Sequence, residues 1–187
     1  MPADRRDSLR RMLAERSARR GQFTLASGRA SSFYVDARLT TMSPEGLALI
    51  GPLALEEIAV AGWRPDSVGG LTLGADPISY AIAYASAGTP RLVRAFTVRK
   101  EAKAHGTGKL VEGPFRPGDA VVVIEDVITT GGSALKAAAA IAAAGGEILG
   151  VLALVDREEG GREAIESAGY SVRALARAAD ILPLLGG

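Results

Sequence analysis

Short apolar runs alternate along the chain with amphipathic or alanine-rich segments. The run from Val121 to Ile124 consists of β-branched residues without polar alternation, which predicts a strand covered on both faces. Residues 134–144 are almost all strong helix formers and are followed by Gly145 and Gly146, so they predict a helix that ends there. The same order of strand and helix recurs through most of the chain. It predicts an α/β fold, a parallel sheet with helices on both faces.

The other elements are predicted from the same periodicities and from turn residues. Leu9, Met12 and Leu13 keep helical spacing in an amphipathic first helix. Ser43 and Pro44 suit the cap and first position of a helix that runs to about residue 61. The remaining predictions are strands over 22–25, 33–38, 67–70, 91–98, 147–155 and 171–175, helices over 77–87 and 161–168, a polar loop over 100–113 and a closing helix.

Composition narrows the class of protein. The 187 residues are 48% hydrophobic and 23% charged, which is typical of one soluble globular domain. A formal net charge of +1 gives no general electrostatic reason to bind nucleic acid or a membrane. The sequence has no cysteine, which excludes disulfides and thiolate metal sites and suits a reducing cytoplasm. No apolar stretch approaches the ~20 residues that cross a bilayer. We therefore expect a cytoplasmic protein without nucleic-acid or membrane partners.

The end of the apolar run at Ile124 carries the most informative chemistry. Glu125 and Asp126 follow it, and the turn Thr129–Ser133 then leads into the alanine-rich helix. Glycines in this turn allow positive φ and let a phosphate approach the backbone, where the N–H groups at the helix start bind anions. The two carboxylates suit the vicinal hydroxyls of a ribose, because a carboxylate accepts two hydrogen bonds side by side. The segment predicts a site for a phosphorylated sugar.

Three stretches carry a resemblance to a known family. The segment 121–133 lacks the lysine of a Walker A loop and the G-x-G-x-x-G of a Rossmann turn, but it resembles the phosphoribosyl-pyrophosphate (PRPP) motif of type I phosphoribosyltransferases. Residues 97–106 contain the pattern R-K-x-x-K-x-H-G and resemble the catalytic loop of the orotate phosphoribosyltransferase family. The stretches 23–28 and 32–36 resemble the amino-terminal substrate segment of the same family.

The resemblance implies a fold, an activity and partners. The fold would be that of a type I phosphoribosyltransferase, one domain over residues 1–187 with a small hood formed mainly by about 1–40 and the segment after about 156. The activity would transfer the 5-phosphoribosyl group from PRPP to orotate, giving orotidine 5′-phosphate and pyrophosphate in pyrimidine synthesis. The resemblance also implies a homodimer that shares its sites through the 99–110 loop. Mg²⁺ would be held mainly by PRPP or pyrophosphate oxygens and water, without protein ligands.

The resemblance also implies roles for individual residues. Those expected to be catalytic are Lys103, His105, Glu125 and Asp126. Those expected to contact PRPP are Arg99, Lys100, Lys103, His105, Glu125, Asp126, Val127, Ile128, Thr129, Thr130, Gly131, Gly132 and Ser133. Those expected to contact orotate are Thr129, Arg157, Phe33 and Tyr34. Residues 69–76 are expected to form the turn that receives pyrophosphate.

Plainer interpretations of the same residues stay open. The acid pair can be solvated at the end of an ordinary strand, the aromatic pair Phe33–Tyr34 can be core, and Arg157 can form a surface ion pair with Asp156 or Glu158. The charges of the 99–105 loop can be solvated surface. The chain also lacks two cations that some family members carry, because it has Ala26 before the Ser-Gly pair and Leu71-Thr72-Leu73 in the pyrophosphate turn.

Two other functions compete with transfer to orotate. One is phosphoribosyl transfer to a purine or to another pyrimidine base, which uses the same PRPP motif. The other is a regulator that senses PRPP without catalysis. Such a regulator should present a basic nucleic-acid surface, and the near-neutral net charge of +1 argues against it.

Overall fold

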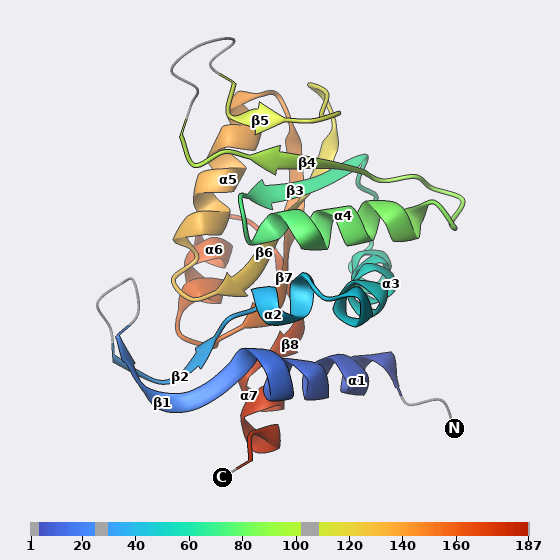
Figure 1. Cartoon of the computed structure of the whole chain (residues 1–187). Helices are drawn as coiled ribbons and strands as arrows, with labels where there is room; N and C mark the ends of the chain where they lie inside the picture. The colour runs from blue at the N-terminus through green and yellow to red at the C-terminus, as the bar shows by residue number, and fades with distance from the viewer. Residues whose placement is uncertain (1–3, 25–29, 102–108, 187) are drawn as a thin grey trace.

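The computed structural model describes residues 4–24, 30–101 and 109–186, and Figure 1 shows the arrangement of their elements. In chain order these are α1 (Arg5–Met12), the π-helical turn η1 (Leu13–Ser17), β1 (Ala18–Thr24), β2 (Ala30–Val35), α2 (Arg38–Thr41), α3 (Pro44–Val60), β3 (Ser67–Leu71), α4 (Ala75–Ser86), β4 (Arg94–Val98), β5 (Val111–Glu112), β6 (Ala120–Ile128), α5 (Gly132–Ala143), β7 (Glu147–Asp156), α6 (Gly161–Ser167), β8 (Val172–Arg177), α7 (Ala178–Ile181) and the 3₁₀ turn η2 (Leu182–Leu184).

The central sheet has the order β5-β4-β3-β6-β7-β8. Its strands pair in parallel, except that β5 runs antiparallel to β4 at one edge. Strands β3, β4 and β6 point towards the side of the molecule where the β1–β2 hairpin lies (Figure 1). The predicted α/β fold is confirmed, and its carboxyl-end edge is the place where ligands of such sheets bind.

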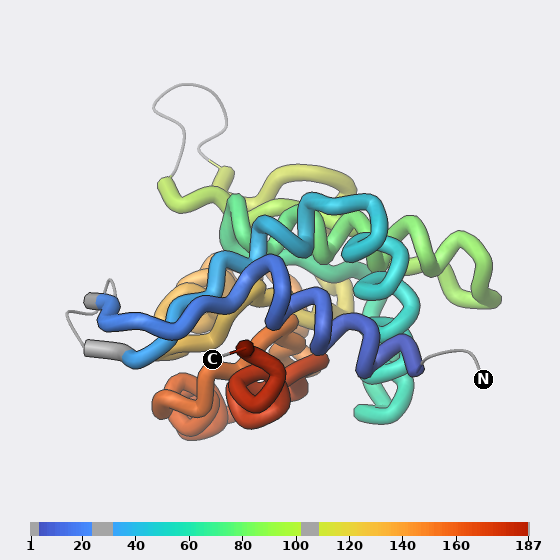
Figure 2. Tube along the Cα trace, turned by 60° about the horizontal axis from the view of Figure 1, so that its bottom comes forward, coloured from blue at the N-terminus to red at the C-terminus, as the bar shows by residue number. Residues whose placement is uncertain are grey.

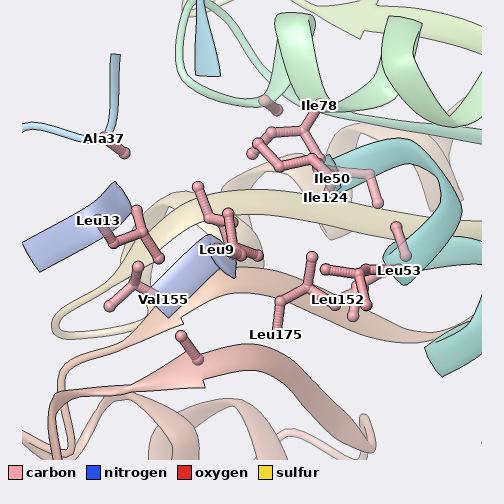
Figure 3. Packing of buried hydrophobic residues seen from close by; sticks show 14 of the residues in the cluster. Leu9, Leu13, Ala37, Ile50, Leu53, Ile78, Ile124, Leu152, Val155 and Leu175 are labelled. Carbon is pink, nitrogen blue, oxygen red and sulfur yellow. The ribbon is translucent and has the colours of Figure 1, made fainter. Parts of the chain in front are cut away.

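Two hydrophobic clusters cover the two faces of the sheet. Alternate residues of β6 divide between them: Val122 and Ile124 face the cluster formed with α1, α3 and α4, whereas Val121 and Val123 face the cluster formed with α5 and α6. Figure 3 shows the first cluster, in which side chains from the three helices meet side chains of β6, β7 and β8. The unbroken β-branched run is thus buried on both sides, as predicted.

The N-terminal and C-terminal segments lie side by side beside the sheet. Strands β1 and β2 form an antiparallel hairpin, and Figure 2 shows α1 running from the N-terminus to this hairpin beside the C-terminal segment. Arg20 of β1 donates to the carbonyl oxygen of Leu182 at 2.9 Å, and the backbone N–H of Asp36 donates to the Ser17 carbonyl at 2.8 Å. The first contact joins the hairpin to the C-terminal segment, and the second joins the end of β2 to η1.

Several predicted boundaries are wrong by a few residues. The strand predicted over 33–38 ends at Val35, because the Asp36 carboxylate accepts hydrogen bonds from the backbone and side chain of Arg38 and turns the chain into α2. Helix α4 begins at Ala75, ahead of the predicted Pro77, and β4 begins at Arg94. The predicted loop contains β5, whose two residues pair with the end of β4. In the part of the chain described here, no helix is long and apolar enough to cross a membrane.

Candidate functional site

A pocket of about 620 Å³ lies at the carboxyl-end edge of the sheet. Five segments line it: the end of β2 with the start of α2, the turn between β3 and α4, the chain just after β4, the end of β6 with the turn into α5, and the end of β7. Its lining residues are Tyr34, Val35, Asp36, Ala37, Arg38, Leu71, Thr72, Leu73, Gly74, Lys100, Glu125, Asp126, Val127, Ile128, Thr129, Thr130, Gly131, Gly132, Ser133 and Arg157. The whole predicted segment 125–133 therefore faces one cavity.

The turn before α5 is built for an anion. Gly131 is the N-cap residue, with a φ of 82°, and no side chain caps the helix. The first N–H groups of α5 therefore have no intrahelical acceptor and are directed towards the pocket end of the helix. Both glycines allow positive φ, and in the structure Gly131 adopts it, whereas Gly132 is already the first residue of α5. A Cβ at Gly131 would also lie 2.7 Å from the Gly161 carbonyl oxygen.

The two adjacent carboxylates differ in environment. Glu125 is only 8% exposed, whereas Asp126 is half-buried and accepts a hydrogen bond from the backbone N–H of Val127 at 2.8 Å. Burial, followed by the negative charge of Asp126, raises the pKa of Glu125 well above its usual range. The Asp126 carboxyl group lies against Gly74, where an added Cβ would come within 2.7 Å of its Oδ1 atom. Gly74 thus lets the turn between β3 and α4 approach the acid pair.

The raised pKa of Glu125 predicts a pH-dependent stability. The folded protein holds the Glu125 proton more tightly than the unfolded chain does, so the free energy of unfolding falls as pH rises from about 4.5, the ordinary value, through the raised pKa. We expect Glu125→Gln to match the wild type near pH 4.5 and to melt at a higher temperature than the wild type at pH 8. Its free energy of unfolding should then exceed that of the wild type by ~1.4 kcal/mol for each unit of the shift. Thermal melts across this range measure the difference. The exposed Glu163→Gln serves as control, and parallel melting curves for Glu125→Gln and wild type would refute the prediction.

Arg157 is not the surface ion pair that the sequence left open. Its side chain is 3% exposed, and Nη2 donates to the Phe33 carbonyl oxygen and to Glu159 Oε1, each at 2.8 Å. The guanidinium carbon lies 4.4 Å from the centre of the Phe33 ring. The neighbouring Asp156 pairs with Arg162 instead, at 2.7 Å. Arg157 is therefore a fixed cation in the pocket wall.

The two predicted aromatic contacts separate in the structure. Phe33 is buried in the core cluster, where its ring packs against the Arg157 guanidinium. It is not among the pocket-lining residues described. Tyr34 lines the pocket and is 41% exposed, with its ring 5.5 Å from that of Phe23. The alternation of β2 sends one ring to the core and the next to the cavity.

The basic loop is described only at its two ends. Lys100 lines the pocket, and its carbonyl oxygen accepts a hydrogen bond from Lys136 Nζ of α5 at 2.7 Å. Arg99 pairs with Glu112 of β5 at 3.9 Å and is not a pocket-lining residue. Lys103 and His105 lie outside the described residues, as does Ala26.

Asp36 and Arg38 line the pocket and were not among the predicted site residues. Arg38 binds the Asp36 carboxylate through Nε and Nη2 at 2.8 and 2.9 Å, and this hydrogen bonding lowers the pKa of Asp36. The sequence signal was an acid and an arginine two residues apart at the end of a strand. This signal did not lead to a predicted site, because the strand was predicted to continue through Arg38.

Comparisons with known proteins agree with this geometry. No family model matches the chain. An orotate phosphoribosyltransferase of Aquifex aeolicus is 47% identical over 180 residues, which cover 95% of this chain and 97% of the relative. Crystal structures of the orotate phosphoribosyltransferase of Mycobacterium tuberculosis H37Rv superpose with a TM-score of 0.83 for the Fe(III) dicitrate complex and 0.79 for the PRPP complex. Their sequence identities are 44% and 41%, and each covers 95% of this chain and 99% of the solved one.

The sequence identity extends over nearly the full length of both chains, and the folds superpose. The pocket of this chain lies at the segment that resembles the PRPP motif. The chain belongs to the orotate phosphoribosyltransferase family.

Proposed function

We propose that this enzyme transfers the 5-phosphoribosyl group of PRPP to orotate, giving orotidine 5′-phosphate and pyrophosphate in pyrimidine synthesis. One observation carries the proposal for this chain: a single pocket gathers an anion-binding turn, an acid pair and a buried guanidinium. The turn suits the 5′-phosphate, the acid pair suits the ribose hydroxyls, and Arg157 suits a carboxylate or carbonyl of orotate.

The proposed reaction exchanges one bond for another at C1 of the ribose. A ring nitrogen of orotate forms the new bond to C1 as the bond to the pyrophosphate oxygen breaks. Orotate brings an anionic nitrogen, so no strong protein base is needed. Positive charge develops on the sugar, and the carboxylates Glu125 and Asp126 at the pocket floor tolerate it. Thr129 and Tyr34 complete the proposed base contacts.

Negative charge collects on the leaving pyrophosphate and needs cations. We propose that Arg99, Lys100, Lys103 and His105 supply them from the loop, since the pyrophosphate turn itself carries none. Arg38, which lines the pocket, adds a guanidinium group to its wall. Closure of the loop would also exclude water, which competes with orotate for C1.

Mg²⁺ is the proposed cofactor. Among the residues that the structure describes, no three His, Cys, Asp or Glu side chains gather as a metal cage, and the pocket offers the adjacent pair Glu125–Asp126. This donor set fits an ion held mainly by phosphate oxygens and water. When bound, the ion neutralises charge on pyrophosphate.

A spectrophotometric assay tests the proposed activity. Orotate with PRPP and Mg²⁺ should be consumed, whereas uracil, adenine and hypoxanthine should not. Turnover of a purine without turnover of orotate would reject the substrate. Binding of PRPP with no turnover of any base would favour a PRPP sensor instead.

We propose that the enzyme works as a homodimer. An apolar groove of about 520 Å³ between α2, α3 and α4 is lined by Met42, Tyr80 and Tyr84, which expose between 48% and 86% of their surface. Exposed apolar surface of this kind marks an interface. It is continuous with the strand that leads into the basic loop, because the Tyr80 hydroxyl lies 3.2 Å from Thr97 Oγ1 of β4. A second copy of the chain seated there would bring its own 99–110 loop close to this pocket.

Mixing two inactive variants tests whether sites are shared. If Lys103 acts in the neighbouring subunit, a mixture of Lys103→Ala and Asp126→Asn contains mixed dimers with one intact site, and about a quarter of wild-type activity should return. Size-exclusion chromatography establishes that exchange has occurred. Activity no greater than the sum of the two parents would show that Lys103 serves its own subunit.

We further propose that residues 1–187 act as one domain, with the hood over the pocket formed by about 1–40 and the segment after about 156. The Arg157–Phe33 contact, which joins these two segments, supports this division. The absence of cysteine from the sequence suits the cytoplasm, where we propose that the enzyme works.

A further inference from the structure

A buried acid ends the stretch 69–76 that is expected to receive pyrophosphate. Asp76 is only 7% exposed, in the first turn of α4. No ion pair to it is found among the described residues, and its two carboxylate oxygens accept hydrogen bonds from two hydroxyls. Thr72 Oγ1 donates to Oδ2 at 2.7 Å and Thr97 Oγ1 donates to Oδ1 at 2.8 Å. Burying a carboxylate in this way is costly, so its retention needs a reason.

The directions of these hydrogen bonds are fixed by chemistry. An ionised carboxylate only accepts, so both threonine hydroxyls must donate to Asp76. The Tyr80 hydroxyl, 3.2 Å from Thr97 Oγ1, is then the donor of that bond. The helix start of α4 adds a favourable dipole, since Asp76 lies in its first turn. The result is one polar network with a single arrangement of its protons.

The network joins two segments that face the pocket. On one side, Thr72 lies in the turn 71–74, where its backbone N–H donates to the Val98 carbonyl at 2.8 Å and the Asp76 N–H donates to the Leu73 carbonyl at 3.3 Å. On the other side, Thr97 lies near the end of β4, three residues before Lys100, which lines the pocket. Asp76 therefore ties the turn to the strand that leads to Lys100.

We infer that Asp76 is a positioning residue for the pyrophosphate half of the pocket: it holds the turn 71–74 against the end of β4 and so sets where the turn lies relative to Lys100. The inference rests on the proposed function, in which this turn receives pyrophosphate. The turn carries no cation of its own, so its contribution is backbone geometry, and that geometry depends on its anchoring.

Calorimetric titration with two probes tests the inference: pyrophosphate with Mg²⁺, and ribose 5-phosphate. Asp76→Ala should weaken pyrophosphate binding about tenfold, or ~1.4 kcal/mol, and leave ribose 5-phosphate binding within about twofold. Thr72→Val keeps the buried carboxylate and its bond to Thr97, and it should show a smaller loss of the same kind. It decides the question if Asp76→Ala does not fold.

The matched control is Ser86→Ala, which removes buried hydrogen bonds to Ala83 and Val93 at the far end of the same helix. It should lower the melting temperature without separating the two probes. Three results would overturn the inference. Asp76→Ala and Thr72→Val could lose affinity equally for both probes, they could lose no affinity for pyrophosphate, or the wild type could bind no pyrophosphate. Orotate turnover by the wild type is measured separately, so failure of the proposed activity is distinguished from failure of this role.

Discussion

Replacing Lys103 with alanine should slow the chemical step about a hundredfold or more, the size of losing one transition-state donor (~2.7–4 kcal/mol). The described cations on the pocket wall are Arg38, Lys100 and Arg157, and the last is held by Phe33 and Glu159 on the hood side. Neutralisation of the negative charge on the departing pyrophosphate therefore depends on the cations of the loop. Single-turnover mixing of enzyme with PRPP and orotate measures the rate constant for chemistry.

Lys109→Ala is the control for the loss of Lys103, because it removes the same charge from the end of the same loop, where the side chain is exposed. We expect its rate constant to stay within about threefold of the wild type, as for an exposed charge. If Lys103→Ala keeps the wild-type rate constant for chemistry, the proposed leaving-group role is wrong.

Gly131→Ala should reduce kcat/KM for PRPP about a hundredfold, or ~2.7 kcal/mol. A side chain at a φ of 82° costs ~1–2 kcal/mol for an L-residue. The new Cβ would also lie 2.7 Å from the Gly161 carbonyl oxygen and 2.9 Å from Ile165 Cγ1. The turn must shift to relieve these contacts, and the N–H groups that we propose to bind the 5′-phosphate would shift with it. Steady-state kinetics at varied PRPP, with a thermal melt, measure both effects.

The neighbouring glycine provides the control for Gly131. A Cβ at Gly132 meets only Thr130 Oγ1, at 3.7 Å, and Gly132 lies in the first turn of α5. Gly132→Ala should therefore keep its stability and lose far less PRPP affinity than Gly131→Ala. Similar kinetics for the two variants would show that the conformation of Gly131 is not what forms the phosphate site.

The sequence predicted the parts of the site that depend on local order. Burial of β6 on both faces follows from its unbroken β-branched run, and the acids and turn that follow it are placed by that strand and by α5. Gly131 and Gly132 looked equivalent in sequence, since which of two glycines takes the left-handed conformation depends on where the helix starts.

Features made by tertiary contact could not be predicted from the sequence alone. Arg157 was compatible with a surface pair to Asp156 or Glu158, but its partners are the Phe33 carbonyl, 124 residues away, and Glu159. The Asp76 network likewise joins the turn after β3 to the end of β4 through Thr97. No periodicity records such pairings, because they depend on which strands are neighbours in the sheet.

A crystal structure with ribose 5-phosphate bound is the decisive test of the proposed sugar site. The phosphate should lie at the N–H groups of the turn 129–133, and two ring hydroxyls of the sugar should lie on Glu125 and Asp126. A sugar whose hydroxyls lie away from both carboxylates, or a phosphate bound elsewhere in the pocket, would contradict it.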